Sequence, residues 1–314
     1  MKNHRFLWLR NRTTDNRKCE KARNIKEKCT IEMFNTDLDQ LAKSGQCFRM
    51  RLVAETEHGG IWSAAAGGRY VEVMQNGSHF LFSCEEDEFE GGWRTYFDMD
   101  TDYEAVKCSV DPEDEYLQAA MAFGGGVRIL RQDLWEMIVT FLISQNNNIP
   151  RIRNSVDALC AKFGERKTGI GLVLEPDGCV KPVEKTYDSF PEAGAVAAGG
   201  LEGLAGLGLG YRDKYIWTMA EKCSGPDGAK WLDDLRAADY HTAHGMLTAE
   251  FGIGRKVADC VCLFGLHHVE AFPVDTHVKQ IVNTYYPGGF PLERYRGYAG
   301  ILQQYMFYYK LNDK

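Results

Sequence analysis

Between residues 34 and 103, the chain shows period-two alternation or short β-rich runs separated by turn-forming residues. Asn76-Gly77 lies between the last two of these runs. This dipeptide favours the left-handed backbone of a type I′ turn, so it is typical of a two-residue hairpin. The pattern therefore predicts an antiparallel sheet with strands at residues 47–55, 61–66, 69–75 and 79–83.

Further along the chain, the apolar residues recur with helical spacing. Residues 134–143 are apolar almost all the way round, which indicates a helix buried at the centre of a bundle. Residues 149–163 carry one apolar stripe with polar residues opposite it, as in an amphipathic helix. An acidic run at 85–90 is expected to be a solvated loop, and 168–200 a poorly patterned connector. The predicted fold class is α+β, with the sheet preceding the helices.

A glycine turn joins two helical patterns near residue 252. Gly252 and Gly254 follow a segment that can be helical, and they precede apolar positions that recur at i, i+3, i+4 and i+7 from Val257 onward. Glycines permit positive φ and close backbone approach, while unpaired N–H groups at the start of the second helix suit a phosphate. Lys256 lies in the first turn, where the helix dipole disfavours an ammonium and favours the neutral, nucleophilic amine.

Asp275, nineteen residues after that lysine, lies in the sequence Phe-Pro-Val-Asp-Thr-His at 272–277, which runs into a new helical pattern. Asp275 is expected to be the N-cap of this helix. A lysine and a capped carboxylate so close in sequence favour a reactive site. The structural alternative is a solvated lysine at a helix start and an aspartate that serves only as a cap.

Three other groups of side chains have two interpretations each. The asparagines at 146–148 lie between two helices, where they either cap helix ends or contact bases and phosphates. Tyr211 and Arg212 follow a glycine-rich turn, and they are either a surface pair or a wedge and base reader for nucleic acid. Gln303 and Phe307 share one helical face, an arrangement more common in core packing than in binding sites.

Composition narrows the class of protein. The 314 residues are 44% apolar and 26% charged, with a net charge of −7, which is ordinary for a globular protein. No run of 18 apolar residues occurs, so no membrane span is expected. The ten cysteines lack paired C-x-x-C spacing, which favours reduced thiols in a cytoplasmic protein and argues against a zinc ribbon or an iron-sulfur cluster. We therefore expect no metal and no cofactor.

Residues 1–28 carry ten Lys or Arg against three acidic residues, and they lack the apolar core of a signal peptide. The segment is interpreted as a disordered basic extension, or as a start assigned too early ahead of Met33, in preference to a dedicated DNA-binding arm. The expected domains are a basic extension at 1–32, an antiparallel β domain at 33–118 and a helical domain at 119–314.

Five segments, taken together and in this order, resemble the 8-oxoguanine DNA glycosylases of the helix-hairpin-helix superfamily. The resemblance covers residues 34–309 and implies a TATA-binding-protein-like antiparallel β domain followed by an all-helical HhH-GPD domain, with the active site between them. The segments are GVRILRQD (126–133), SQNNNIPRI (144–152), GLGYRDKY (208–215), GIGRKVADC (252–260) and FPVDTH (272–277).

The resemblance implies a bifunctional enzyme that excises 8-oxoguanine from duplex DNA and then cleaves the abasic strand by β-elimination. Lys256 matches the family's nucleophile, which forms a Schiff base with the sugar, and Asp275 matches its essential aspartate. Duplex DNA containing oxidised guanine is the implied partner. The protein is expected to be a monomer in the cytoplasm, associated with the nucleoid through its substrate.

Residue roles in base recognition also follow from the resemblance. Cys260 and Phe307 would sandwich the extruded base, and Gln303 would bind its Watson–Crick edge. The carbonyl of Gly45 would accept the N7 hydrogen that 8-oxoguanine has and guanine lacks. The implied DNA-binding residues are His277 on a phosphate, Asn146, Arg151 and Arg212 at the orphaned cytosine, Tyr211 as the wedge, and Gly252 and Gly254 of the hairpin.

Two positions depart from the family pattern. Phe251 replaces the usual proline of the hairpin, and Met50 replaces an aromatic residue after G-Q-x-F-R. Two other functions are considered. A monofunctional glycosylase for alkylated bases would use an aspartate-activated water and would not need Lys256. A non-catalytic helix-hairpin-helix DNA-binding protein would not need Gln303, Phe307 and Cys260 to cluster.

Overall fold

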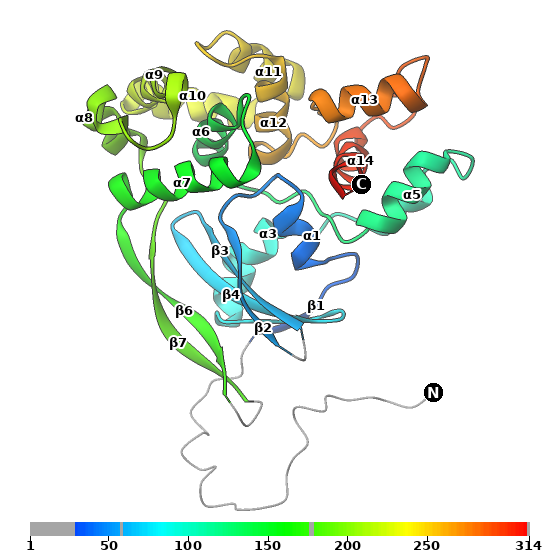
Figure 1. The fold of residues 1–314 in the computed structure, drawn as a ribbon, viewed down its shortest axis with the longest axis horizontal. Helices are drawn as coiled ribbons and strands as arrows, with labels where there is room; N and C mark the ends of the chain where they lie inside the picture. Colours follow the sequence, from blue (N-terminus) through cyan, green and yellow to red (C-terminus); the bar gives the residue numbers. More distant parts are fainter. Residues whose placement is uncertain (1–28, 57–58, 176–178, 313–314) are drawn as a thin grey trace, which may run out of the picture.

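The computed structural model describes residues 29–56, 59–175 and 179–312. A twisted sheet with short helices lies beside a larger assembly of helices, and α7 (Ile149–Phe163) runs between the two (Figure 1). The sheet precedes most of the helices in the chain, as the sequence predicted. The basic extension expected at 1–28 lies outside the described residues.

Five strands form a continuous antiparallel path in the order β1-β5-β4-β3-β2. Asn76 pairs with His79 across a two-residue turn, and Gly77 has a φ of +61°, which confirms the predicted hairpin. All four predicted strands are present. Strand β1 adds a fifth from residues that were assigned to the basic extension. The strands are β1 (Thr30–Glu32), β2 (Met50–Thr56), β3 (Gly59–Ala66), β4 (Arg69–Asn76) and β5 (His79–Phe82).

A second hairpin joins the sheet from the middle of the helical region. It consists of β6 (Arg166–Leu174) and β7 (Val180–Asp188), and β6 pairs in parallel with β4. Helix α8 (Ala193–Leu204) follows it. The prediction of a poorly patterned connector at 168–200 is therefore wrong.

The glycines of β6 explain why its strand pattern is weak. An ideal Cβ at Gly169 would lie 2.8 Å from Cβ of Tyr70, and one at Gly171 would lie 2.8 Å from Cδ of Glu72. Glu72 is fully buried, and its carboxylate accepts the backbone N–H of Leu172 at 2.7 Å. Alternate glycines therefore make room for side chains of β4, although in sequence they indicate a loop.

The acidic run at 85–90 is also more ordered than predicted. Helix α2 (Glu86–Glu88) leads into the π-helical turn η3 (Phe89–Trp93). Phe89 is fully buried and Trp93 is 1% exposed, so these two rings, one helical turn apart, hold the segment against the sheet. The prediction of a solvated loop is wrong because it considered only the charges.

The helical region is built around α6 (Leu134–Ser144), whose residues 134–143 are all buried, as predicted. Helix α5 (Glu115–Gly124) crosses the boundary expected between residues 118 and 119, and it packs along α14 through the rings of Tyr116 and Tyr309. The other helices are α1 (Leu38–Lys43), α3 (Arg94–Tyr96), α4 (Tyr103–Cys108), η4 (Gly210–Arg212), α9 (Asp213–Cys223), α10 (Pro226–Ala237), α11 (Tyr240–Thr248), α12 (Arg255–Gly265), α13 (Thr276–Tyr285) and α14 (Ala299–Asn312).

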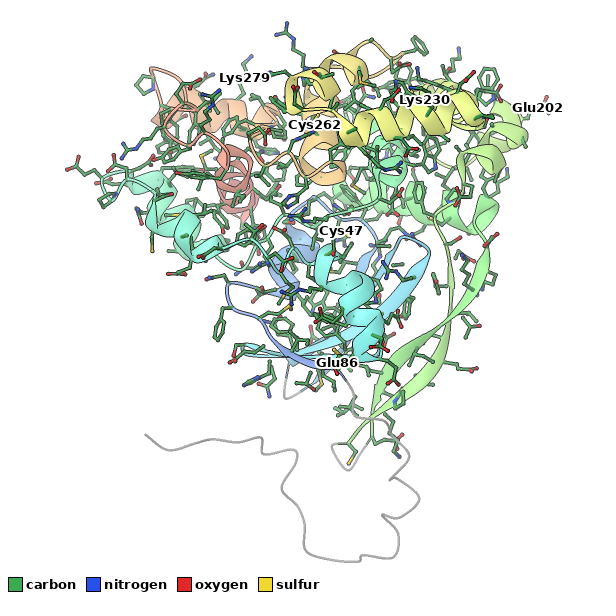
Figure 2. The ribbon with its side chains drawn as sticks, turned by 180° about the vertical axis from the view of Figure 1, so that it is seen from behind. Cys47, Glu86, Glu202, Lys230, Cys262 and Lys279 are labelled. Atoms are coloured by element: carbon green, nitrogen blue, oxygen red, sulfur yellow. The ribbon has the colours of Figure 1, made fainter. Side chains whose placement is uncertain are left out.

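Seven cysteines are buried and form no disulfide within the described residues. Cys47 lies where the sheet meets the helices, and Cys262 lies within the helical region (Figure 2). In the part of the chain that the structure describes, no helix is both long and apolar enough to cross a membrane.

Candidate active site

The turn between α11 and α12 has the geometry expected of a glycine hairpin. Gly252 has a φ of +88°, and an ideal Cβ there would lie 2.4 Å from Cγ of Tyr215. Its carbonyl accepts a hydrogen bond from Nε2 of Gln145 at 3.1 Å. At Gly254, the N-cap of α12, a Cβ would meet nothing within 4 Å. Gly252 is therefore required by packing, whereas Gly254 leaves the start of α12 open.

This difference predicts opposite outcomes for two alanine substitutions. Gly252→Ala must adopt a strained φ and displace Tyr215, so the free energy of unfolding is expected to fall by about 1–3 kcal/mol. Gly254→Ala is expected to cost about 1 kcal/mol or less, because φ is −87° and the space is open. Urea unfolding of the two variants measures the difference. Equal losses would contradict the assigned role of Tyr215.

The charges of Lys256 and Asp275 both affect the pKa of the buried Cys260 thiol. Lys256 lies in the first turn of α12, one turn before Cys260, with Nζ 5.4 Å from the ring centroid of Phe141. Burial raises the pKa of Cys260 to about 11, a rise that Asp275 increases and Lys256 opposes. The thiol is therefore neutral near pH 7.

Asp275 is the N-cap of α13, as predicted. Its Oδ1 accepts the backbone N–H of Val278 at 2.8 Å. The cap fixes the carboxylate at the start of the helix, and the side chain remains partly exposed. The carboxylate is thus held in place without being enclosed.

Gln303 and Phe307 extend this cluster from α14. Gln303 is 4% exposed, and its Nε2 donates to the carbonyl of Pro273 at 3.1 Å, two residues before Asp275. Its Oε1 is buried and has no hydrogen-bond partner among the described residues. The ring of Phe307 lies 6.1 Å from that of His277, at 73°. Polar groups are rarely buried unpaired, so the amide oxygen of Gln303 marks a place for a donor.

Gly45 faces Phe307 from the other side of the cluster. It has a φ of +77°, and an ideal Cβ there would lie 3.1 Å from Cε1 of Phe307 and 3.9 Å from Cδ1 of Ile149. A side chain at this position would press on the Phe307 ring. The glycine therefore brings main chain, with its carbonyl, close to Phe307.

Two buried glutamines that sequence reasoning missed hold the Gly45 turn. Gln46 is fully buried; its Nε2 donates to the carbonyl of Arg128 at 2.8 Å, and its Oε1 accepts the N–H of Leu130 at 2.8 Å. Gln304 donates to the carbonyl of Ser44 at 2.7 Å. The only signal in the sequence was an amide within otherwise apolar surroundings.

A second group of predicted residues gathers at the junction of α6 and α7. Arg212 is 6% exposed and donates from Nε to the carbonyl of Gln145 at 2.8 Å and from Nη2 to that of Asn146 at 2.9 Å. Asn146 itself is exposed and has a φ of +46°. In this structure the guanidinium thus serves to hold the junction. Tyr211 is 52% exposed, with its ring centroid 4.6 Å from Cζ of Arg212.

The asparagine run divides between the two predicted roles. Asn148 caps α7 by accepting the N–H of Arg151 at 3.0 Å, and Asn147 donates to the carbonyl of Ile143 at 3.1 Å. The capping interpretation is confirmed for these two. Asn146 and the side chain of Arg151 are exposed, as is His277 on α13.

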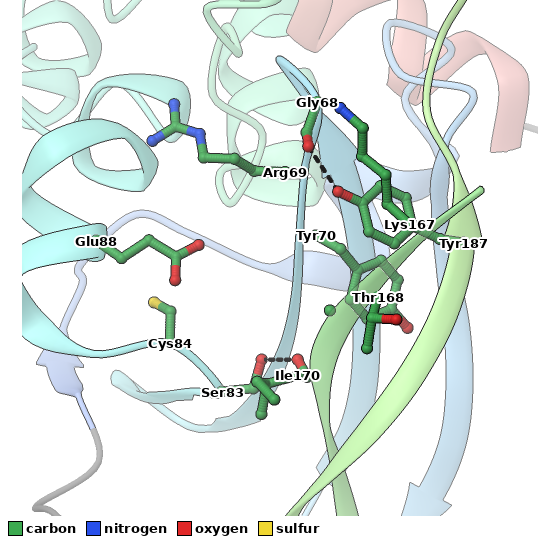
Figure 3. Close-up of a pocket in the computed structure, with 11 residues that line it drawn as sticks. Gly68, Arg69, Tyr70, Ser83, Cys84, Glu88, Lys167, Thr168, Ile170 and Tyr187 are labelled. Carbon is green, nitrogen blue, oxygen red and sulfur yellow. Dashed lines mark hydrogen bonds between the residues drawn. The ribbon is translucent and has the colours of Figure 1, made fainter. Parts of the chain in front are cut away.

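A separate pocket on the sheet contains none of the predicted site residues. It has a volume of about 480 Å³ and is lined by the stacked rings of Tyr70 and Tyr187, 5.2 Å apart (Figure 3). The hydroxyl of Tyr187 donates to the carbonyl of Gly68 at 2.6 Å, and that of Tyr70 to Glu72 at 2.5 Å. These hydroxyls are satisfied within the protein, in contrast to the Gln303 amide oxygen.

Comparisons with known proteins agree with this fold. Residues 28–138 match the family model of the 8-oxoguanine DNA glycosylase N-terminal domain. The MBOgg1 structure, solved with a low-affinity DNA ligand, is 32% identical with a TM-score of 0.79 and covers 92% of this chain and 98% of its own. An 8-oxoguanine glycosylase/lyase from Clostridium acetobutylicum was solved with duplex DNA containing cytosine opposite 8-oxoguanine. It is 30% identical with a TM-score of 0.78, and the match covers 92% of this chain and 96% of the clostridial chain.

The similarity to curated sequences is shorter. An N-glycosylase/DNA lyase of Saccharomyces cerevisiae is 37% identical over 170 residues, which are 51% of this chain and 42% of the yeast protein. The match thus spans less than half of that relative. Fold and hairpin together define a two-domain helix-hairpin-helix protein. Because the structural match extends over nearly the whole chain, this protein belongs to the 8-oxoguanine DNA glycosylase family.

Proposed function

We propose that this protein is a bifunctional DNA glycosylase and lyase that excises 8-oxoguanine from duplex DNA through a Schiff base on Lys256. The observation that carries the proposal is the buried, unpartnered amide oxygen of Gln303, whose Nε2 is bonded to the carbonyl of Pro273, two residues before the N-cap Asp275. The relatives support it, since their names describe 8-oxoguanine glycosylases and N-glycosylase/DNA lyases.

The amide of Gln303 suits the Watson–Crick edge of an extruded guanine. Its Nε2 is occupied by Pro273, which fixes Oε1 as an acceptor facing away from that bond. The Watson–Crick edge of a guanine carries N–H donors, so it can satisfy this oxygen. Cys260 and Phe307 would lie on the two faces of the base, one presenting a neutral thiol and the other an aromatic ring.

Discrimination against guanine is assigned to the carbonyl of Gly45. An acceptor held near Phe307 can take the N7 hydrogen of 8-oxoguanine, whereas guanine has an N7 lone pair that would repel it. The hydrogen bonds of Gln46 and Gln304 keep the turn rigid, so an unpaired carbonyl cannot move away from the wrong base. A site built for one hydrogen bond rejects the analogue that lacks it.

The reaction requires a nucleophile and a fixed negative charge. The bond between C1′ and the base breaks, and the base leaves with the bonding electrons and takes a proton. The amine of Lys256 forms a new bond to C1′ and gives up a proton, while the carboxylate of Asp275 stabilises the positive charge that develops on the sugar. The sugar ring then opens to a Schiff base, which acidifies the C2′ hydrogen, and its loss with the 3′ phosphate nicks the strand.

Contacts with the duplex are proposed on the face that carries the hairpin. The start of α12 has open N–H groups for a phosphate, and His277 is exposed beside Phe307 for a second one. Tyr211 would fill the space left by the extruded base. Asn146, Arg151 and Arg212 would read the orphaned cytosine, with Arg212 exchanging part of its bonding to the α6–α7 junction for the base.

The two alternative functions fit these contacts less well. A monofunctional glycosylase for alkylated bases has no use for an amine against a neutral thiol, and similarity to an Archaeoglobus fulgidus 3-methyladenine glycosylase, at 19% identity, extends to the fold alone. A non-catalytic DNA-binding protein would leave the buried amide oxygen of Gln303 unpaired without compensation. Finally, we propose that the protein works as a monomer in the cytoplasm, where DNA is accessible.

Borohydride trapping on a duplex with 8-oxoguanine opposite cytosine tests the proposed function. Borohydride reduces a Schiff base to a stable amine, so a covalent protein–DNA adduct is expected in denaturing gels. A matched duplex with guanine at the same position should give none. Excision without an adduct would show that an activated water and not an amine attacks the sugar, as in a monofunctional glycosylase, and binding without excision would support the non-catalytic alternative.

The orphaned-base contacts are tested separately, with cytosine, adenine, guanine or thymine placed opposite 8-oxoguanine. Single-turnover excision should be fastest opposite cytosine. Equal rates for all four duplexes would remove the roles assigned to Asn146, Arg151 and Arg212, while leaving the chemistry of Lys256 unaffected.

A further inference from the structure

Three aromatic side chains form a continuous strip from the proposed wedge to the hairpin. The ring of Tyr215 lies 5.9 Å from that of Tyr211 and 5.0 Å from that of Phe251, and both contacts are edge-to-face at 79°. We call Tyr211, Tyr215 and Phe251 the aromatic strip. Its two ends are exposed, Tyr211 at 52% and Phe251 at 58%, while Tyr215 is partly buried between them.

The exposed end at Phe251 is held in place from several directions. Glu250, the residue before it, is tied to Lys222 by an ion pair of 2.7 Å. Gly252, the residue after it, packs against Tyr215 and is bonded to Gln145. The backbone is therefore fixed on both sides of Phe251, and its ring already contacts Tyr215. The rigid backbone of this turn therefore keeps the Phe251 ring exposed to solvent.

Its position relative to the DNA follows from the hairpin. Phe251 precedes Gly254, the open N-cap of α12, by three residues, so the ring flanks the place proposed for a phosphate. The two exposed ends of the strip are at most roughly 11 Å apart, the sum of the two ring separations. That span corresponds to about three stacked nucleotides at 3.4 Å each. The wedge and Phe251 can thus contact the same short stretch of DNA.

We propose that Phe251 is a second aromatic DNA contact, packing on a sugar or base beside the phosphate at α12, and that Tyr215 is the positioning residue that fixes it relative to Tyr211. This inference rests on the proposed function and concerns a position where the chain has phenylalanine in place of the family's usual proline. An apolar contact adds affinity without charge. This suits a chain with a net charge of −7, whose electrostatic attraction to phosphate must be local.

Binding of a duplex with a tetrahydrofuran abasic-site analogue opposite cytosine tests the contact, because this analogue cannot be cleaved by β-elimination. Phe251→Ala is expected to weaken binding by about fivefold or more at every salt concentration, as loss of one aromatic stacking contact does. The slope of log Kd against log salt should stay unchanged, since no phosphate charge is lost. Phe251→Tyr should bind within about twofold of wild type.

The matched control is Phe34→Ala, at a phenylalanine that is 65% exposed in the loop between β1 and α1. Its affinity should equal that of wild type. Wild-type affinity for Phe251→Ala, or a changed salt slope, would overturn the inference. Melting followed by circular dichroism checks that the variants fold. If Phe251→Ala melts at a lower temperature than wild type, Phe251→Leu, which keeps the bulk but loses the ring, replaces it, and the same weakening of binding with an unchanged salt slope is expected.

The role of Tyr215 is tested by combining substitutions. Phe251→Ala should have its full effect on affinity in a Tyr215→Phe background, which keeps the ring. In a Tyr215→Ala background, where Phe251 has lost its support, the effect should fall below about twofold. Equal effects in both backgrounds would refute the positioning role.

These results can be separated from the proposed function itself. Wild-type protein that neither excises 8-oxoguanine nor forms a borohydride adduct would refute the function. Wild-type protein that does both, with Phe251→Ala binding normally, would refute only the second aromatic contact.

Discussion

Lys256→Gln is expected to abolish both base excision and strand nicking on an 8-oxoguanine duplex. The substitution keeps a polar side chain in the first turn of α12 but removes the amine, so no bond to C1′ and no Schiff base can form. Loss of a nucleophile in other enzymes costs about 10⁴-fold to 10⁶-fold in rate. Strand breaks after alkali measure excision under single-turnover conditions, strand breaks without alkali measure nicking, and borohydride trapping measures the Schiff base, all in one protein preparation.

Lys230→Gln is the matched control, because Lys230 lies on α10 with 72% of its side chain exposed and pairs only with Asp234, one helical turn away. Figure 2 shows Lys230 on α10, apart from Lys279 on α13. Its excision rate should equal that of wild type. A borohydride adduct that persists in Lys256→Gln would show that another amine attacks the sugar.

Local patterns account for much of what could be predicted about the fold. The hairpin at Asn76 and Gly77 depends on two adjacent residues, and the burial of α6 depends on an apolar run. The cap at Asp275 and the glycine turn before α12 are local in the same way. Each of these features follows from the preferences of residues close in sequence, so a single chain was enough to find them.

Long-range packing accounts for what was missed. The glycines of β6 weaken its strand pattern, and only the side chains of Tyr70 and Glu72, about a hundred residues earlier, explain why they are there. No local rule connects such distant positions, so β6 could not be identified from sequence. The helical segment from residue 86 was missed for a different reason: its acidic charges concealed Phe89 and Trp93, two buried rings one helical turn apart.

The candidate site likewise combines features that local sequence predicted with features that only the fold creates. Lys256 and Asp275 were chosen from local chemistry, but their opposite influences on the pKa of Cys260 are a property of the fold. The support of the Gly45 turn by Gln46 and Gln304 joins residues more than 250 positions apart, and its only signal in the sequence was an amide within apolar surroundings. Arg212 was assigned to the orphaned base, yet in the structure it also holds the turn at Asn146, which gives it two roles.

Asp275→Asn is expected to slow excision by about 10²-fold to 10³-fold while leaving the fold intact. An asparagine side chain also accepts a hydrogen bond at an N-cap, so the bond from the Val278 N–H can be kept. What the substitution removes is the negative charge that stabilises the developing cation on the sugar. Single-turnover excision rates and urea unfolding therefore report separately on the charge and on the cap.

Asp239→Asn provides the matched control, since Asp239 caps α11 by accepting the N–H of Thr242 at 2.8 Å and lies outside the cluster around Cys260. Both substitutions should change the free energy of unfolding by less than about 1 kcal/mol, as Asn and Asp are similar N-caps. Only Asp275→Asn should lose activity. If its excision rate equalled that of wild type, the carboxylate would serve α13 alone, and the charge that stabilises the sugar would have to come from another group.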